Sequence, residues 1–323
     1  MKILKTPPER FLALPGYSFQ ARYINVGSAD NAQEQSSSQS SSDIEPEELM
    51  MHYVDYGDNE APVILMLHGE PTWSYLYRKM ICIAESHGFR VIAPDLIGFG
   101  KSDKFDDQGA YTYAKHLLWL ERFIESLGLD NIHLICQDWG GLLGLRMVAK
   151  FPERFAAVVA ANTMLPTGDY EAPEAFFKWQ RFSQEVNPFP VSQVIQNATV
   201  KDLIPEVAAA YDAPFPSEEY KCGVRKFPLL VPTQADDVES QNNRDAWKIL
   251  STFNKPFMTA FSDSDPVTRG GDAIFQKLIP GCRGQAHVTL KGGGHFLQED
   301  VGQDLINAAL TCFKSAVKSN SKE

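Results

Sequence analysis

The chain has 323 residues, of which 44% are hydrophobic, enough for one large core or for one domain with an insert. Its formal net charge of −11 argues against nucleic acid or an acidic membrane surface as a partner. The first residues lack the apolar core of a signal peptide, and no apolar run approaches the ~20 residues of a membrane helix. The 5 cysteines show no CxxC spacing, which indicates reduced thiols without a metal site. We therefore expect a cytoplasmic protein with no metal or organic cofactor.

The predicted elements begin with two strands that open the sheet in antiparallel fashion, at residues 17–26 and 50–56. Between them lies a Ser- and Gln-rich tract, residues 28–43, whose composition cannot bury enough surface to order itself. We expect this tract to be a mobile surface loop. Continuous apolar runs then predict strands buried on both faces, alternating with helices such as 113–127. These strands are 63–67, 90–94, 131–135 and 155–160.

The alternation stops near residue 164, because residues 165–245 carry many prolines and aromatic residues in helical patches without a clear strand. Strand patterns resume at 256–261 and 287–290, and a last helix is predicted at 298–317. The sequence therefore predicts an α/β fold with a mostly parallel, doubly wound sheet. Residues 1–164 and 246–323 would form its core, and residues 165–245 would form a helical cap inserted after the sixth strand.

The most informative segment is residues 134–141, LICQDWGG, where an apolar strand ends at an acid and a helical stretch follows. This strand–turn–helix pattern is typical of the nucleophile elbow of α/β hydrolases, with Asp138 in the place of the usual serine. A serine that attacks saturated carbon would form an ether, which water does not readily cleave. An aspartate forms an ester, which water can cleave. Asp138 therefore favours displacement at saturated carbon over acyl transfer.

The general base is expected at His295, in the glycine-rich turn GGGHF after the last predicted strand. The order nucleophile, acid, histidine along the chain is that of α/β hydrolases. Two acids follow the strand at 256–261, and either could orient the ring of His295. We favour Asp265, with Asp263 as a turn residue, and the sequence leaves both open.

The segment HGEP places Glu70 after the first parallel strand, where this fold supplies one backbone N–H of the oxyanion hole. The second N–H would come from Trp139, which directly follows the nucleophile. Trp139 also carries an indole N–H, a donor with no acceptor, and a second indole could complete a small anion site. Trp179 in the cap is the candidate, although ordinary apolar packing would also explain it. An apolar substrate pocket is expected from Phe176, Phe215 and Pro216.

Together these motifs resemble the haloalkane dehalogenases. The similar segments cover nearly the whole chain outside its first residues and the Ser-rich tract, and they are HGEPTWSYLYRKM (68–80), PDLIGFGKSD (94–103), QDWGG (137–141), APFP (213–216), GVRKFP (223–228) and GHF (294–296). The resemblance is to the subfamily with an Asp–His–Asp triad and two halide-binding tryptophans. One departure is Cys136, where the elbow usually has glycine.

The resemblance implies that Asp138 is the nucleophile, His295 the base and Asp265 the acid, with halide held by Trp139 and Trp179. A small haloalkane would yield a primary alcohol, a halide ion and a proton, an activity suited to detoxification by a monomeric enzyme. An epoxide hydrolase remains an alternative, because it also uses an aspartate elbow and the cap contains Tyr170, Tyr211 and Tyr220. A ligand-binding protein without activity on the same fold is a further alternative.

Overall fold

The computed structural model describes residues 1–28 and 47–320. Its centre is an eight-stranded sheet in the order β10-β9-β8-β7-β4-β5-β3-β2. Only β2 and β3 run antiparallel to their neighbours, and the remaining pairs are parallel. The strands are β2 (Arg22–Ser28), β3 (Glu48–Tyr56), β4 (Val63–Leu67), β5 (Arg90–Pro94), β7 (Ile132–Gln137), β8 (Phe155–Ala161), β9 (Phe257–Ser262) and β10 (Val288–Leu290).

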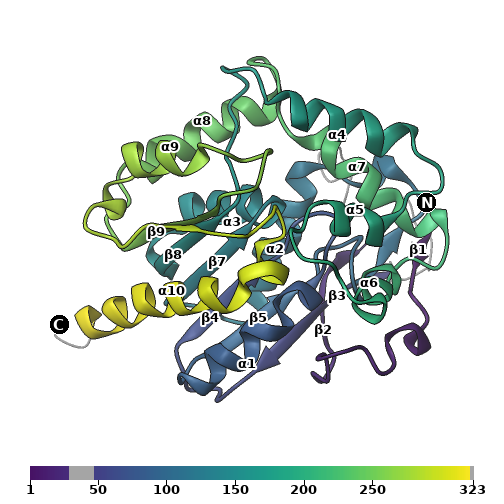
Figure 1. The fold of residues 1–323 in the computed structure, drawn as a ribbon, viewed down its shortest axis with the longest axis horizontal. Helices are drawn as coiled ribbons and strands as arrows, with labels where there is room; N and C mark the ends of the chain where they lie inside the picture. The colour runs from purple at the N-terminus through teal and green to yellow at the C-terminus, as the bar shows by residue number, and fades with distance from the viewer. Residues whose placement is uncertain (29–46, 321–323) are drawn as a thin grey trace, which may run out of the picture.

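Helices cover both faces of this sheet, as a doubly wound fold requires (Figure 1). Helices α1 and α10 lie side by side on one face, whereas α2 and α3 lie on the other. The core helices are α1 (Arg78–Ser86), α2 (Tyr113–Ser126), α3 (Trp139–Lys150), α9 (Gly271–Leu278) and α10 (Leu297–Asn320). A small separate sheet pairs β1 (Ile3–Leu4) with β6 (Lys104–Phe105), and short 3-10 helices complete the core: η1 (Pro8–Phe11), η2 (Ser74–Tyr77), η3 (Gln108–Ala110), η4 (Pro152–Arg154) and η6 (Pro280–Cys282).

The local sequence explains these elements. Strand β7 is buried along its whole length, and most of its residues are apolar instead of alternating with exposed polar ones. Its two polar side chains, His133 and Gln137, are hydrogen-bonded to the carbonyls of Val63 and His295. Thr112 is the N-cap of helix α2, since its side chain accepts a hydrogen bond from the Lys115 N–H and so caps the first turn. The buried side of α2 carries Trp119 and Phe123, spaced four residues apart as an amphipathic helix requires.

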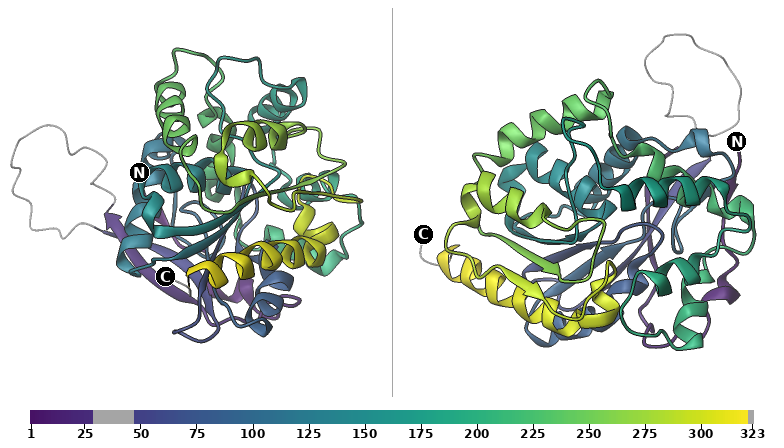
Figure 2. Two further views of the ribbon diagram at one scale, coloured as in Figure 1. Left: turned by 90° about the vertical axis from the view of Figure 1, so that its left-hand side faces the viewer. Right: turned by 45° about the horizontal axis from the view of Figure 1, so that its top comes forward.

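Residues 165–245, all of which the structure describes, contain helices joined by loops and no strand, so the predicted absence of strands there is confirmed. These helices lie over the carboxyl ends of the parallel strands (Figure 2). The predicted boundary at residue 245 falls within the last of them, which packs against α3. The helices are α4 (Glu174–Glu185), α5 (Val191–Asn197), α6 (Pro205–Asp212), η5 (Glu218–Lys221), α7 (Cys222–Leu230) and α8 (Val238–Leu250).

The predicted parallel sheet is confirmed, and the strands at 63–67 and 90–94 have the expected bounds. The first strand was predicted too early, because β2 starts only at Arg22. Tyr17 instead packs its ring against Trp73 at 4.9 Å and shares a 2.7 Å hydrogen bond with Ser74, so this segment crosses η2 outside the sheet. The predicted Ser-rich loop lies outside the described residues, except for Ser28 at the end of β2.

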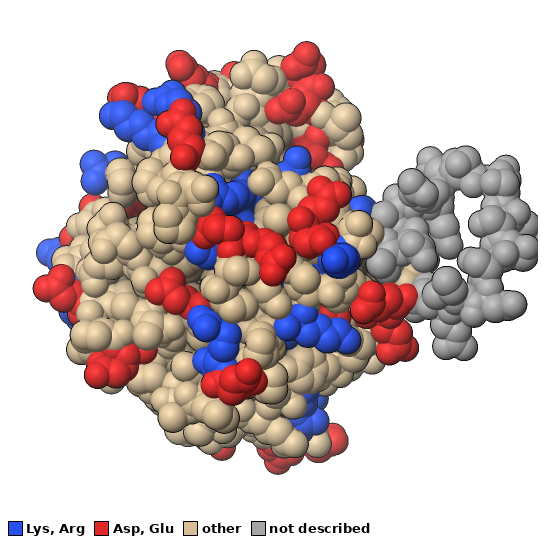
Figure 3. All heavy atoms as spheres, turned by 90° about the vertical axis from the view of Figure 1, so that its right-hand side faces the viewer, with Lys and Arg blue, Asp and Glu red and all other residues tan. Residues whose placement is uncertain are grey.

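Two surface properties bear on the expected partners. In the described part of the chain, no helix combines the length and the apolar character needed to cross a membrane. On the face drawn in Figure 3, basic and acidic side chains of the described residues are interspersed without a continuous basic surface. That face therefore offers no electrostatic footprint for nucleic acid.

Candidate active site

Asp138 lies at the sharp turn between β7 and α3, as the sequence predicted. Its backbone has a positive φ of 50°, which a residue other than glycine adopts only where the surroundings impose it. Helix α3 approaches β4 so closely that a Cβ on Gly140 would lie 2.0 Å from the Leu67 carbonyl oxygen. The Thr163 hydroxyl also donates to the Asp138 carbonyl at 2.7 Å. These contacts hold the Asp138 side chain above the carboxyl end of the sheet.

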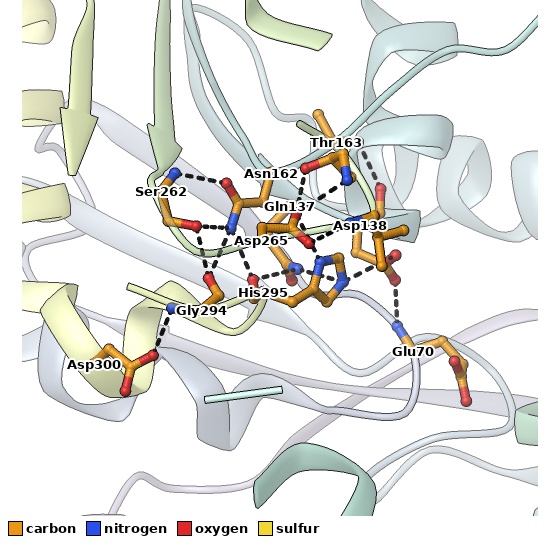
Figure 4. A network of polar contacts seen from close by, with 12 residues as sticks. Glu70, Gln137, Asp138, Asn162, Thr163, Ser262, Asp265, Gly294, His295 and Asp300 are labelled. Atoms are coloured by element: carbon orange, nitrogen blue, oxygen red, sulfur yellow. Dashed lines mark hydrogen bonds and ion pairs between the residues drawn. The ribbon is translucent and has the colours of Figure 1, made fainter. Parts of the chain in front are cut away.

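His295 lies between two carboxylates (Figure 4). Its Nδ1 is 3.0 Å from Oδ2 of Asp265, and its Nε2 is 3.4 Å from Oδ2 of Asp138. Burial lowers the pKa of His295. The negative charges of Asp265 and, second, of Asp138 raise it by more than burial lowers it, so that the pKa is about 10. The three side chains thus form one linear Asp–His–Asp arrangement.

Of the two candidate acids, only Asp265 contacts His295. Asp265 is buried, and its carboxylate also accepts hydrogen bonds from the Val267 N–H at 2.8 Å and from the Thr268 hydroxyl. Burial alone would raise the pKa of Asp265, but His295 and these donors hold it well below its usual range. Asp263 is exposed and accepts the Gly292 N–H at 2.9 Å, which is the turn role expected for it.

The backbone of His295 is held by polar side chains that the sequence reasoning did not single out as site residues. Amide groups of Gln137 and Asn162 donate to the His295 carbonyl at 3.2 and 3.1 Å. The Ser262 hydroxyl and the Asp300 carboxylate bind the carbonyl and the N–H of the preceding Gly294. Gln137, Asn162 and Ser262 each stand at the carboxyl end of a parallel strand or directly after it, where open α/β sheets place their sites. Their position at the ends of parallel strands could therefore have identified Gln137, Asn162 and Ser262 from the sequence.

The Glu70 N–H donates to Oδ1 of Asp138 at 2.8 Å, so one expected oxyanion donor contacts the side chain of Asp138. The turn before it depends on Gly69, since a Cβ there would lie 2.3 Å from the Asp138 Cβ. The Glu70 side chain is buried and lines the same cavity, and its Oε1 has no hydrogen-bond partner among the described residues. Burial first, and the charge of Asp138 second, raise the pKa of Glu70 well above its usual value, which favours the neutral carboxyl.

A cavity of about 230 Å³ lies above Asp138 and His295, lined by residues that follow the parallel strands and by residues of the 165–245 segment. Trp139, Trp179 and Phe176 line it, as predicted. The expectation for Phe215 and Pro216 was wrong, because neither residue lines this cavity. The segment that contains them turns toward the N-terminal residues, where the Pro214 carbonyl accepts the Thr6 hydroxyl at 2.8 Å. Phe215 is buried there, and Pro216 is exposed.

The indole N–H groups of Trp139 and Trp179 have no acceptor among the described residues, although both rings line the cavity. Two other tryptophans behave differently, since the indole N–H groups of Trp73 and Trp247 donate to the carbonyls of Ala210 and Leu165. Two unpaired donors at one apolar cavity offer hydrogen bonds to a small anion. The described residues contain no group of three or more His, Cys, Asp or Glu side chains able to hold a metal ion.

This combination of sheet, elbow and Asp–His–Asp arrangement defines an α/β hydrolase with an aspartate in the elbow. The family model of the alpha/beta hydrolase fold matches residues 62–300. A haloalkane dehalogenase of Psychrobacter cryohalolentis is 55% identical over 94% of this chain and 95% of its own length. A haloalkane dehalogenase of Mycobacterium marinum is 42% identical over 94% of this chain and 97% of its own length.

The solved structure of the haloalkane dehalogenase DpaA from Paraglaciecola agarilytica has a TM-score of 0.84 and 36% identity, covering 96% of this chain and 98% of that one. The chain belongs to the haloalkane dehalogenase family. It is a hydrolase that acts on carbon–halide bonds in haloalkanes.

Proposed function

We propose that dehalogenation takes place in two steps at Asp138. In the first step, a carboxylate oxygen of Asp138 attacks the carbon that bears the halogen, and the carbon–halogen bond breaks as the new C–O bond forms. The halide departs with the bonding electron pair toward the indole N–H groups of Trp139 and Trp179. The observation that carries this proposal is that both unpaired indoles line the same cavity as Asp138 and His295.

In the second step, His295 takes a proton from water and the resulting hydroxide attacks the carboxyl carbon of the ester. Asp265 holds the Nδ1–H of the ring and stabilises the imidazolium that forms. The backbone N–H of Glu70, already 2.8 Å from the Asp138 carboxylate, stabilises the oxyanion together with the backbone N–H of Trp139. Collapse of the tetrahedral state cleaves the ester bond, and the departing alkoxide takes the hydroxyl proton of that state to give the primary alcohol and the Asp138 carboxylate. His295 then releases its proton to solvent, which accounts for the acid formed alongside the halide.

The electrostatics of the site suit this order of events. While Asp138 is ionised, its charge helps to raise the pKa of His295 to about 10 and so keeps the ring protonated. Esterification removes that charge, and the pKa of His295 falls because one of its two carboxylate neighbours has become neutral. The base therefore becomes available once the ester exists.

The cavity lining speaks against the epoxide hydrolase alternative. That reaction needs a cap tyrosine to protonate the leaving alkoxide, yet no tyrosine is among the described residues that line the cavity. Tyr211 is buried elsewhere, where its hydroxyl donates to Glu299 at 2.5 Å. Tyr170 is 88% exposed and lies outside the catalytic cavity.

Replacement of the base tests the proposal. His295→Phe should form the ester from 1,2-dibromoethane but fail to hydrolyse it, so mass spectrometry should find added mass on the peptide containing Asp138. The exposed His87 is the matched control, and His87→Phe should turn over normally. Undiminished turnover by His295→Phe would disprove the mechanism. A wild-type protein that releases neither halide nor acid would instead support the ligand-binding alternative.

We also propose that residues 165–245 act as a cap that determines which substrates reach Asp138, on a core of residues 1–164 and 246–323. The sequence favours a monomer, whereas the similar DpaA structure is described as tetrameric. Sedimentation velocity of the full chain at several concentrations distinguishes these two states.

A further inference from the structure

The side chain of Gln137, the last residue of β7, contacts His295 at two points, although Gln137 is not among the residues that line the catalytic cavity. Its amide nitrogen is 3.2 Å from the carbonyl oxygen of His295 and also 3.2 Å from Nε2 of the ring (Figure 4). The amide oxygen Oε1 is buried and has no hydrogen-bond partner among the described residues. The contact with Nε2 has no task in the two steps at Asp138 described above.

The backbone of His295 determines which end of the Gln137 amide faces the ring. A backbone carbonyl only accepts hydrogen bonds, so the amide atom 3.2 Å from it must be the nitrogen, which carries two N–H groups. The opposite orientation would place Oε1 against the carbonyl oxygen, an acceptor against an acceptor. Nε2 of His295 therefore faces a group that can donate a hydrogen bond but cannot accept one.

This donor suits one protonation state of the ring. With a proton on Nε2, the ring and the amide would present N–H groups to each other. Without that proton, the lone pair of Nε2 accepts a hydrogen bond from the amide. A hydrogen bond to the neutral form of a titratable group disfavours its charged form. Gln137 therefore favours neutral His295, with the remaining proton on Nδ1, which is 3.0 Å from the Asp265 carboxylate.

The carboxyl groups around the ring act in the opposite direction. Asp265 and Asp138 face Nδ1 and Nε2, and their charges favour the protonated ring. Glu70, from the loop after β4, also interacts with the ring, and burial favours the neutral form of Glu70. In the free enzyme the charge of Asp138 outweighs the amide of Gln137. In the ester that charge is absent, whereas the amide remains 3.2 Å from Nε2.

We propose that Gln137 is a positioning residue for hydrolysis of the ester: its amide keeps Nε2 of His295 free of a proton while Asp138 is esterified, so that the ring can take the proton of the attacking water. The proposal rests on the proposed function, since it assumes an ester at Asp138 and a base at His295. Water can replace the amide at Nε2, because the amide nitrogen keeps its hydrogen bond to the His295 carbonyl. Formation of the ester needs no base, so Gln137 acts on the second step alone.

Rapid-quench kinetics with 1,2-dibromoethane over a range of pH tests the proposal, since bromide release reports formation of the ester and alcohol release reports its hydrolysis. Gln137→Met removes the donor and keeps an unbranched side chain of similar size. One neutral hydrogen bond corresponds to about one pKa unit, so the pH midpoint of ester hydrolysis should rise by about one unit. Hydrolysis then slows about tenfold below the midpoint but not on the plateau at high pH. Formation of the ester should be unchanged.

Gln298→Met is the matched control. Gln298 is also a buried glutamine whose Oε1 has no partner among the described residues, but its amide contacts the Tyr77 hydroxyl and not His295. The pH midpoint of ester hydrolysis in this variant should equal that of the wild type.

An equilibrium measurement complements the kinetics. Asp138→Asn removes the charge of Asp138, as the ester does, and NMR of the His295 ring then reports its pKa in this background. Addition of Gln137→Met should raise that pKa by about one unit. Gln137→Glu, which keeps the size of the amide, should raise it further, because a carboxylate favours the protonated ring. Gln137→Glu also serves as the test if Gln137→Met does not fold.

A purely structural role of Gln137 gives a different result. Hydrolysis would then slow by the same factor at every pH, and the pKa of His295 in the Asp138→Asn background would not change. That outcome, or an equal shift of the midpoint in Gln298→Met, would overturn the proposal while the proposed function stands. Absence of any ester on Asp138 in His295→Phe would instead disprove the proposed function itself.

Discussion

The backbone N–H of Gly294, the residue before His295, donates a hydrogen bond to the Asp300 carboxylate at 2.8 Å. The same carboxylate accepts the N–H groups of Val200 at 2.9 Å and Lys201 at 2.8 Å, in the cap segment between α5 and α6. Asp300 is buried at the start of α10; its bond to the Gly294 N–H is buried, and its bonds to the N–H groups of Val200 and Lys201 are partly buried. One side chain thus fixes the loop of His295 and the adjacent wall of the cavity relative to each other.

Asp300→Ala should therefore impair both catalysis and stability. It leaves three backbone donors without their acceptor, and each buried unpaired group costs about 1–3 kcal/mol. We expect a fall in the free energy of unfolding of roughly 2–4 kcal/mol in urea and a decrease in kcat of about tenfold. Asp300→Asn, which keeps one acceptor oxygen, should lose less. Asp304→Ala, at an exposed position of the same helix, should match the wild type in both measurements.

Replacement of Asp265 and of the nearby Asp263 by asparagine should have very different effects on activity. Asp265→Asn removes the acceptor that orients the Nδ1–H of His295, and a comparable change in a serine protease triad lowers kcat by about 10⁴. We expect halide release to show one rapid turnover followed by very slow steady turnover, as the ester accumulates. Asp263→Asn should stay within about twofold of the wild type, because the exposed Asp263 carboxylate accepts hydrogen bonds from Ser264 and Gly292 and makes no contact with His295. Similar losses in both variants would contradict the assignment.

The pKa of His295 gives a prediction for pH dependence. It is raised from 6.5 to about 10 in the free enzyme, so the folded state binds this proton more tightly than the unfolded state. The resulting stabilisation is fully present below about pH 6.5 and is lost as the pH rises through about 10. Urea unfolding between pH 6 and 10.5 should show this decline. In Asp138→Asn the decline should begin at lower pH, and NMR of the His295 ring should report a lower pKa.

Halide binding should quench tryptophan fluorescence in the absence of substrate, because Trp139 and Trp179 both line the cavity and their indole N–H groups have no acceptor among the described residues. Titration with bromide gives the dissociation constant. Trp179→Phe removes one hydrogen bond to an anion, a loss worth about 1.5–3 kcal/mol, and should weaken binding at least tenfold. Trp119→Phe is the control, since Trp119 packs on His116 and does not line the catalytic cavity. Quenching that persists unchanged in Trp179→Phe would place the halide elsewhere.

Much of the fold could be predicted from the sequence because its signals are local. The apolar runs of β4 and β5 and the strand–turn–helix pattern around Asp138 each depend on residues close together in the chain. The glycine-rich motif around His295 also allowed the position of His295 after the last strand to be predicted. Local sequence pattern did not reveal that Tyr17 lies outside the sheet and packs on Trp73, because that contact joins residues 56 positions apart in the chain.

The parts of the site that were missed or wrong depend on three-dimensional packing. Asp300 is an ordinary helix residue in the sequence, and only its contacts with Gly294 and the cap give it a role in the site. Phe215 was assigned to the pocket for its apolar ring, but docking of its segment against the N-terminal residues turns it away. Trp179 lines the cavity because of how α4 is seated on the core, which its sequence position alone does not determine.

Asp138, Asp265 and His295 all lie on loops next to the sheet, whereas Trp179 lies on α4, in the segment proposed as the cap. Mild heating that loosens the cap before the sheet would move Trp179 away while His295 and Asp265 keep their places. Formation of the ester would then slow first, and an ester already formed would still be hydrolysed. Activity would disappear below the melting temperature of the whole protein and return on cooling. Formation of the ester would therefore be lost at a lower temperature than its hydrolysis.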